Sequence, residues 1–415
     1  MTKKSNWFPI LKNKIADQVQ SYLDSLDKEI FLFEKRFKNL KNPKYWLGSL
    51  TGASLYFLYR FEVSGDKRYL QSSESMIVQA TDTLGKRPSI DALYSGFTGL
   101  AWVIEYYRNL VQLKVNKKED PNKDIDDYLV AKLKGKLRLN KTLGRYGLVD
   151  ELVGYGIYGL ERWPRGQSPQ LLNNLVKIFK NKATYSSRGT AWFTLKEDLH
   201  PNEVKYEKLT EGYYNLGLAH GIPGIIGLLS GVLKAHHGTD EIKNLLRESV
   251  KWFLSVDNGK NYDYRLSENL QKMGIGKGRL AWCYCDLGVA PVLVNAGRVL
   301  KDKSIEKQGL IIAKRAAALP EAKSLVGDPF FCHGSSGNFH IFNRLYQSTG
   351  DPRFKKASLK WAANTLKMLK NKKKFHNYPP IGRFEILMGF TGVGLSLLSG
   401  ISEVEPGWDR FLLLS

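Results

Sequence analysis

All three cysteines of the chain fall in two short strings whose residue types are those of a zinc site. Cys283 and Cys285 are separated by one tyrosine, and Cys332 is followed directly by His333. Thiolate sulfur and imidazole nitrogen are ligands that zinc prefers, and catalytic zinc keeps a fourth position open beside three protein ligands. A thiol that coordinates zinc loses its proton at neutral pH. The two strings therefore predict a metal centre that activates thiols.

A short glycine signature recurs along the chain, each time just before an apolar stretch. Its seven four-residue copies end at Gly52, Gly99, Gly154, Gly224, Gly288, Gly337 and Gly392. Successive copies lie between 47 residues (Gly52 to Gly99) and 70 residues (Gly154 to Gly224) apart, a period that accommodates two helices and their connections. We expect a buried helix after each copy, where glycine lets backbones pass closely at the crowded end of a ring of helices. Amphipathic segments such as 240–254 are expected to cover these helices.

The last copy of the signature indicates that the repeats close into a ring. An open solenoid needs polar capping repeats at its ends, but residues 389–399 are as apolar as the middle copies. We therefore expect an all-α fold, an α/α toroid that forms one domain over residues 1–415. The longest gap between copies lacks helical periodicity around residues 183–212, which predicts a small irregular or β insertion before the fourth repeat.

Equivalent positions of several copies carry polar residues. His220, Tyr284 and His333 each stand immediately before the first position of a signature, and Cys283 and Cys332 stand one residue earlier. Equivalent positions lie at one height around a toroid, so these side chains are expected to converge. We predict one zinc ion, held by the two thiols and His333, with its fourth position open.

Cys285 occupies a position where most copies have glycine. It is a candidate fourth zinc ligand, an inert small residue or a spare thiol. We favour the inert small residue, because a separation of two residues can turn a side chain away from the metal that Cys283 binds.

The charge of the chain bears on its partners. There are 63 lysines and arginines against 40 acidic residues, a formal net charge of +23, which attracts nucleic acid, an anionic membrane face or an acidic peptide. The basic residues are dispersed, and no recognisable nucleic-acid module accompanies them. We expect no nucleic-acid partner. The charge is then either a solvated surface or a means of attracting an acidic peptide.

The expected location is the cytoplasm. Three widely spaced cysteines do not make a disulfide framework and fit a reducing compartment. The first 23 residues mix lysines with scattered apolar residues and contain no apolar run suited to a signal peptide or a membrane span.

Four strings together resemble the lanthionine synthetase C-like family, the cyclases of lanthipeptide (lantibiotic) biosynthesis. They are Leu216–Gly224, Arg279–Tyr284, Cys332–Asn338 and Glu405–Arg410. The resemblance extends along the whole chain through the seven glycine copies. It implies an α/α toroid with zinc on Cys283, Cys332 and His333. It also implies that a cysteine thiol of a precursor peptide adds to a dehydroalanine or dehydrobutyrine, which forms a (methyl)lanthionine thioether ring.

The resemblance also implies roles for other residues and partners. His220 is the expected acid–base group. Arg279, one helical turn before Cys283, would stabilise negative charge or orient the site, and Tyr284 would donate a hydrogen bond or pack. The implied partners are a dehydrated precursor with an acidic leader, a dehydratase and a membrane exporter. Attachment to the inner membrane face through such a complex is the alternative to a freely cytoplasmic protein.

One departure from the family pattern concerns catalysis. The family has an aspartate near the start of the third copy, where the ungapped register of this chain has Gly147. Asp150, three residues later, is on the same helical face and is our candidate substitute. Three functions thus remain: a zinc-dependent cyclase, a zinc-stabilised peptide-binding scaffold that has lost catalysis, and a zinc enzyme that alkylates thiols like a prenyltransferase.

Overall fold

The computed structural model describes most of the chain. The described residues are 7–37, 47–84, 89–112, 119–139, 142–199, 204–205, 209, 211–237, 239–273, 278–370 and 382–415. Within these ranges no helix is both long enough and apolar enough to cross a membrane. The residues fall into two compact units, Met1–Leu113 with Leu325–Asp409 and Lys114–Ser324 with Arg410–Ser415. One domain over residues 1–415 stays a prediction.

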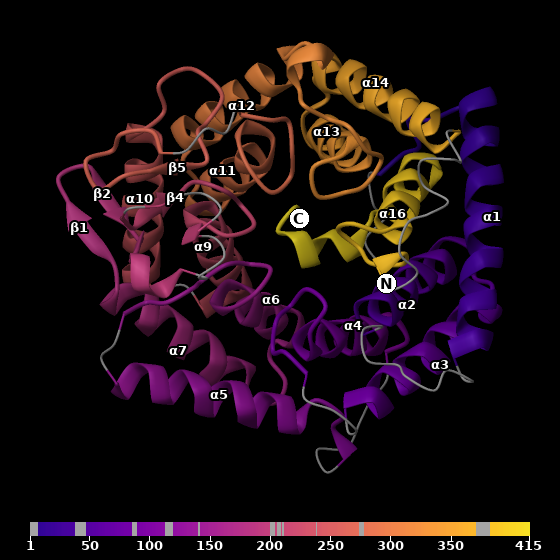
Figure 1. Ribbon diagram of the computed structural model, residues 1–415, viewed down its shortest axis with the longest axis horizontal. Helices are drawn as coiled ribbons and strands as arrows, with labels where there is room; N and C mark the ends of the chain where they lie inside the picture. The colour runs from indigo at the N-terminus through magenta and orange to yellow at the C-terminus, as the bar shows by residue number, and fades with distance from the viewer. Residues whose placement is uncertain are drawn as a thin grey trace. The chain divides into compact units, whose positions relative to one another are not determined.

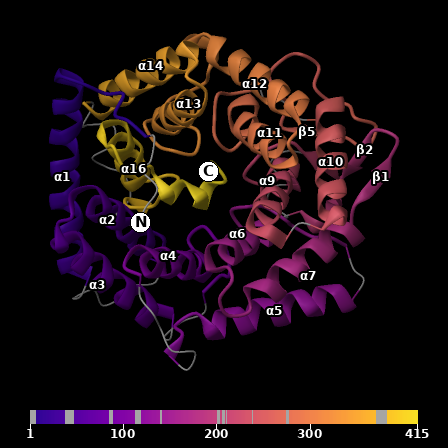
Figure 2. The ribbon, with the colours of Figure 1, turned by 180° about the vertical axis from the view of Figure 1, so that it is seen from behind.

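The first unit consists of buried helices covered by amphipathic ones. Its helices are α1 (Lys14–Phe37), α2 (Leu47–Ser64), α3 (Lys67–Leu84), α4 (Phe97–Leu110), α13 (Ser335–Thr349), α14 (Pro352–Leu369) and α16 (Phe390–Ile401). Residues 47–60 of α2 and 390–400 of α16 are all buried, because helices that are apolar on every face must be surrounded by protein. Helices α3 and α14 pack beside α2 and α13, as Figures 1 and 2 show.

The second unit repeats this arrangement. Its helices are α5 (Lys123–Arg138), α6 (Leu152–Arg162), α7 (Ser168–Asn181), α9 (Ile222–Val232), α10 (Asp240–Ser255), α11 (Asp286–Leu300) and α12 (Lys303–Ala318). Helices α6, α9 and α11 are buried along most of their length, and α7, α10 and α12 pack against them. Short helical turns lie at Lys196–Asp198, Leu233–His237 and Glu321–Lys323, and a further one, Gly407–Leu412, begins in the first unit and ends in the second.

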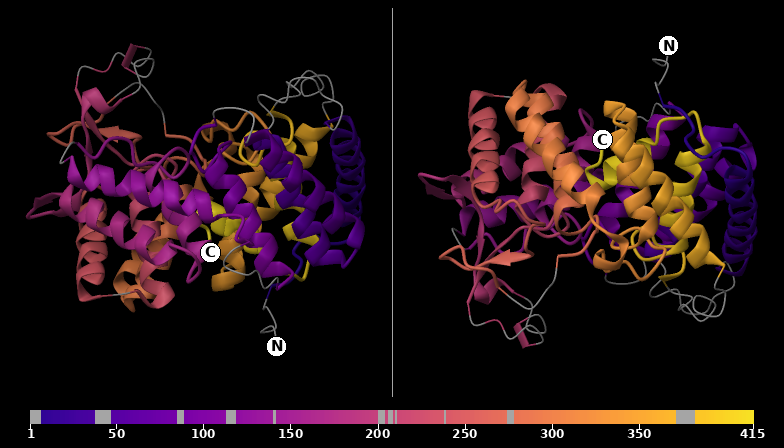
Figure 3. Two further views of the ribbon diagram at one scale, coloured as in Figure 1. Left: turned by 90° about the horizontal axis from the view of Figure 1, so that it is seen from below. Right: turned by 90° about the horizontal axis from the view of Figure 1, so that it is seen from above.

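Among the described residues of the second unit, five short strands interrupt the helices. The hairpin β1 (Thr184–Ser186) and β2 (Gly189–Ala191) lies against α10 at the edge of the unit (Figures 1 and 3). A three-stranded antiparallel sheet has the order β3 (Phe193–Thr194), β4 (Tyr213–Asn215) and β5 (Arg265–Leu266). Strands β1 to β3 fall within the predicted insertion at 183–212, of which residues 200–203, 206–208 and 210 lie outside the described residues.

The seven glycine signatures lie at the starts of seven buried helices, α2, α4, α6, α9, α11, α13 and α16. Glycine is required at several of these positions by the loop just before the helix, and not by crowding among the helices of a ring. A Cβ on Gly288, Gly337 or Gly392 would overlap the backbone carbonyl oxygen of the residue six positions earlier in the chain. In these copies the preceding loop folds back over the first turn of its own helix, and only glycine leaves room for it.

Cys285 is the one signature residue with a strained backbone. The residue before the first turn of α9, α13 and α16 is a glycine with extended φ, whereas Cys285, before α11, has φ +68° and ψ −167°. A non-glycine residue in this region costs about 1–3 kcal/mol. The side chain is fully buried, and burial raises the pKa of the thiol well above its ordinary value.

The strain at Cys285 predicts that glycine is the better residue there. We expect Cys285→Gly to be about 1 kcal/mol more stable than Cys285→Ala, because both lose the thiol and only glycine adopts a positive φ freely. Urea unfolding of the two variants measures the difference. A glycine variant that is less stable than the alanine variant would contradict the strain assigned to this position.

Candidate active site

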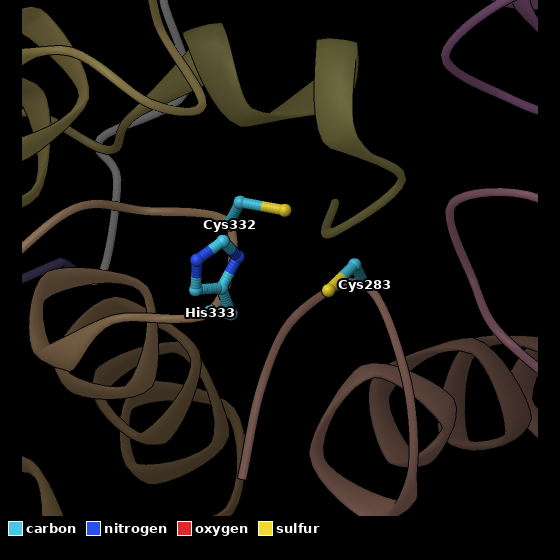
Figure 4. A group of neighbouring side chains, drawn as sticks. All are labelled: Cys283, Cys332 and His333. Carbon is cyan, nitrogen blue, oxygen red and sulfur yellow. The ribbon is translucent and has the colours of Figure 1, made fainter. Parts of the chain in front are cut away.

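The structure brings the three predicted zinc ligands together. Within the described ranges, one ligand atom from each of Cys283, Cys332 and His333 lies within 4.8 Å of the other two (Figure 4). Cys283 is buried, and the other two are half-buried. None of the three cysteines forms a disulfide, and Cys285 is not a member of the group. Two thiols and an imidazole are a donor set that suits zinc, so the residues present fit a three-ligand site.

Backbone hydrogen bonds link equivalent repeat positions within each unit. The residues two positions before the first signature position are bonded to one another from copy to copy. Val149 N–H donates to the carbonyl of Ala219 at 3.3 Å, and Ala219 N–H donates to the carbonyl of Cys283 at 3.2 Å. In the other unit, Cys332 N–H donates to the carbonyl of Leu387 at 3.0 Å. Main-chain bonds thus hold these loops in register within each unit.

His220 is paired with Asp150. Its Nδ1 lies 3.2 Å from Asp150 Oδ1, and the side chains are 39% and 20% exposed. The carboxylate also forms an ion pair with Arg145. An imidazole whose Nδ1–H donates to a carboxylate presents Nε2 for proton transfer. The pair therefore has the composition and geometry of an acid–base group held by an anchored carboxylate.

The carboxylate of Asp150 fills the space left by Gly147. A Cβ on Gly147 would lie 2.5 Å from Asp150 Oδ1. A side chain at residue 147 would therefore require the Asp150 carboxylate to move. Helix α6 begins after Glu151 as α9 begins after Gly221. Asp150 therefore has the same repeat position as His220. The glycine pattern could have indicated this match, but the sequence analysis did not identify it.

A cavity of about 270 Å³ opens beside this pair. Arg145, Asp150, His220 and Tyr284 all line it. The Tyr284 ring centroid lies 6.3 Å from that of His220. Of the four residues predicted to be catalytic, three thus share one cavity, and a small substrate group placed in it would reach all three.

The short strands supply the other wall of the cavity. Thr194, Tyr213, Asn215 and Arg265, from β3, β4 and β5, line it. The Arg265 guanidinium lies 4.6 Å from the centre of the Tyr213 ring. Sequence reasoning missed these residues, because strands of two or three residues have no detectable periodicity. A buried cation here suits a substrate on which negative charge develops.

The position of Arg279 favours one of its two predicted roles, the orientation of the site, over the stabilisation of negative charge on a substrate. Arg279 does not line the cavity, and it interacts instead with Tyr264, whose pKa is raised by burial to about 12, an effect that Arg279 opposes. The ring of Tyr264 packs 4.7 Å from that of Tyr284. Contact of Arg279 with a substrate in this cavity is therefore not supported, whereas orientation of Tyr284 through Tyr264 is.

Three comparisons relate the chain to known proteins. The family described as "Lanthionine synthetase C-like protein" matches residues 48–413. The nisin biosynthesis protein NisC of Lactococcus lactis subsp. lactis is 23% identical over 267 residues, which are 61% of this chain and 62% of that protein. The alignment thus spans less than two thirds of this relative.

A solved structure entitled "Nisin cyclase" superposes with a TM-score of 0.72 at 18% identity, over 95% of this chain and 98% of that one. This similarity shows the fold and confirms the predicted α/α toroid.

Proposed function

The chain belongs to the lanthionine synthetase C-like family, and on that basis we propose that it is a zinc-dependent lanthipeptide cyclase. The substrate is a precursor peptide that contains cysteine together with dehydroalanine or dehydrobutyrine. The reaction joins the cysteine sulfur to the β-carbon of the dehydro residue and gives a (methyl)lanthionine ring. The relatives named for nisin biosynthesis and nisin cyclisation support this reaction class.

Cys283, Cys332 and His333 are the residues that would hold one zinc ion. Zinc bound there would lower the pKa of a substrate thiol and so provide a thiolate at neutral pH. The support for this assignment is the donor set and the 4.8 Å limit within which its three ligand atoms lie.

His220 and Asp150 would handle the proton of the reaction. Attack of the sulfur on the β-carbon moves the electrons of the double bond onto the neighbouring carbonyl, and the resulting enolate takes a proton at its α-carbon. The thiol loses one proton and the α-carbon gains one, so the peptide keeps its mass. We assign delivery of the proton to His220 Nε2, with Asp150 fixing the tautomer and Arg145 fixing Asp150.

The proposal rests chiefly on the position of the Asp150 carboxylate, which occupies the space that a side chain at residue 147 would need. This position supports an intact acid–base pair and argues against a scaffold that lost catalysis at position 147. Tyr284 lines the same cavity and is assigned a hydrogen bond to the substrate. Arg279 is assigned the orientation of Tyr284 through Tyr264.

The partners follow from this chemistry. The net charge of +23 favours a precursor with an acidic leader. A dehydratase must act first, because serine and threonine do not accept a thiolate, and an exporter would remove the product. We propose a cytoplasmic enzyme that reaches the inner membrane face through such a complex.

Incubation with a dehydrated precursor tests the proposal. Ring closure adds no mass, so alkylation of the remaining thiols followed by mass spectrometry counts the rings. A cyclase consumes thiols faster than buffer does. Peptide binding without faster closure would instead support the scaffold, and a gain of mass that requires an added prenyl donor would support the thiol-alkylating enzyme.

A further inference from the structure

Asp328 lies behind the imidazole of His333, on the loop that precedes α13. Its Oδ2 is 3.5 Å from His333 Nε2, and the two side chains are 22% and 28% exposed. Asp328 is not a member of the group formed by His333 and the two thiols. The carboxylate therefore faces one ring nitrogen as a neighbour of the histidine and not as a further ligand, which leaves Nδ1 for the metal.

Asp328 is itself held firmly. Its Oδ1 accepts the N–H of Phe330 at 2.9 Å, and its carbonyl accepts the N–H of Ser335, the first residue of α13, at 3.0 Å. A Cβ on Gly334 would overlap Oδ1, so glycine at this signature position makes room for the carboxylate. With Oδ1 bonded to the backbone, Oδ2 is directed at the imidazole by a fixed loop.

We propose that Asp328 is a positioning residue that orients His333 for zinc, an inference that rests on the zinc site of the proposed function. A carboxylate opposite the metal fixes the tautomer and the orientation of a ligating histidine and raises its basicity. Nothing in the spacing of the ligands indicated this residue, because it stands outside the repeat-matched positions. Removing such a partner lowers metal affinity by about 10–100-fold.

Zinc affinity of the full chain, measured by competition with a chromophoric chelator, tests the proposal without a cyclisation assay. We expect Asp328→Ala to bind zinc about 10–100-fold more weakly than the wild type. Asp328→Asn, which still accepts from Phe330 N–H but lacks the charge, should be intermediate. Asp351→Ala is the matched control. That aspartate also accepts a backbone N–H and pairs with an arginine, at the start of α14, and its loss should leave zinc affinity unchanged.

The possible outcomes distinguish the role of Asp328 from the zinc site and from the cyclase function. Wild-type affinity in folded Asp328→Ala, or equal losses in the Asp328 and Asp351 variants, overturns the role of Asp328. A wild type that binds no zinc overturns both this role and the zinc site. Weakened zinc binding in the Asp328 variants of a protein that closes no rings would retain Asp328 and reject the cyclase. Cobalt in place of zinc adds a spectrum that should shift in Asp328→Asn if the imidazole is reoriented.

Discussion

Replacing Cys332 by alanine is expected to remove the bound zinc and to slow ring formation by about 1,000-fold. The group would lose one of its three ligands. A 1,000-fold slower reaction corresponds to a loss of ~4 kcal/mol in the stabilisation that the metal gives the transition state. Metal content by mass spectrometry and thiol consumption in a dehydrated precursor measure the two effects. Folding should persist, because Cys332 is only half-buried.

Cys285→Ala is the matched control for this experiment. It removes the one thiol of the three that lies outside the ligand group, and this thiol is buried. Zinc content should stay at one equivalent and ring formation should continue. Full zinc content in Cys332→Ala, or zinc loss in Cys285→Ala, would show that the ligands have been assigned wrongly.

The second large effect is expected at Asp150. Asp150→Ala should lower the turnover number by about 100-fold with little change in KM, because His220 loses the carboxylate that fixes its tautomer. Adding Gly147→Asp to that variant should restore much of the rate, since the new side chain enters the space that Asp150 Oδ1 occupied. Steady-state kinetics on a dehydrated precursor measure both changes.

Two further variants serve as controls for moving the carboxylate from residue 150 to residue 147. Gly147→Asp alone places two carboxylates in one space and should lower both stability and rate. Gly147→Asn with Asp150→Ala has the same shape without the charge and should not restore turnover. Unchanged turnover in Asp150→Ala, or equal rescue by asparagine and aspartate at 147, would remove Asp150 from the proton-transfer step.

Much of the fold was predictable because the chain repeats a local rule. The glycine copies mark helix starts, and a loop that folds over its own helix imposes glycine wherever it occurs, as at Gly288 and Gly337. The two-residue strand β5 was not predictable. Its pairing with β4 joins segments far apart in sequence, and two residues show no periodicity.

The candidate site likewise contains residues that the sequence could predict and residues that it could not. The sequence predicted Cys283, Cys332 and His333 as a group because they stand at matching positions of two repeats, and their ligand atoms lie within 4.8 Å of one another. Arg265 and Asp328 were not predictable, because they stand outside those positions and only the packing places them beside the cavity and beside His333. The sequence left two roles open for Arg279, and only packing separates them, because Arg279 does not line the cavity and interacts with Tyr264.

The central claim, that the chain is a zinc-dependent cyclase, is tested most directly by zinc removal. The rate of thiol loss from a dehydrated precursor is measured with zinc-loaded protein, with protein stripped by a chelator, and with stripped protein given zinc again. We predict ring closure well above the buffer rate when zinc is bound, the buffer rate after stripping, and recovery on return of zinc but not of magnesium. Equal rates before and after stripping, or a zinc-loaded protein no faster than buffer, would contradict the account.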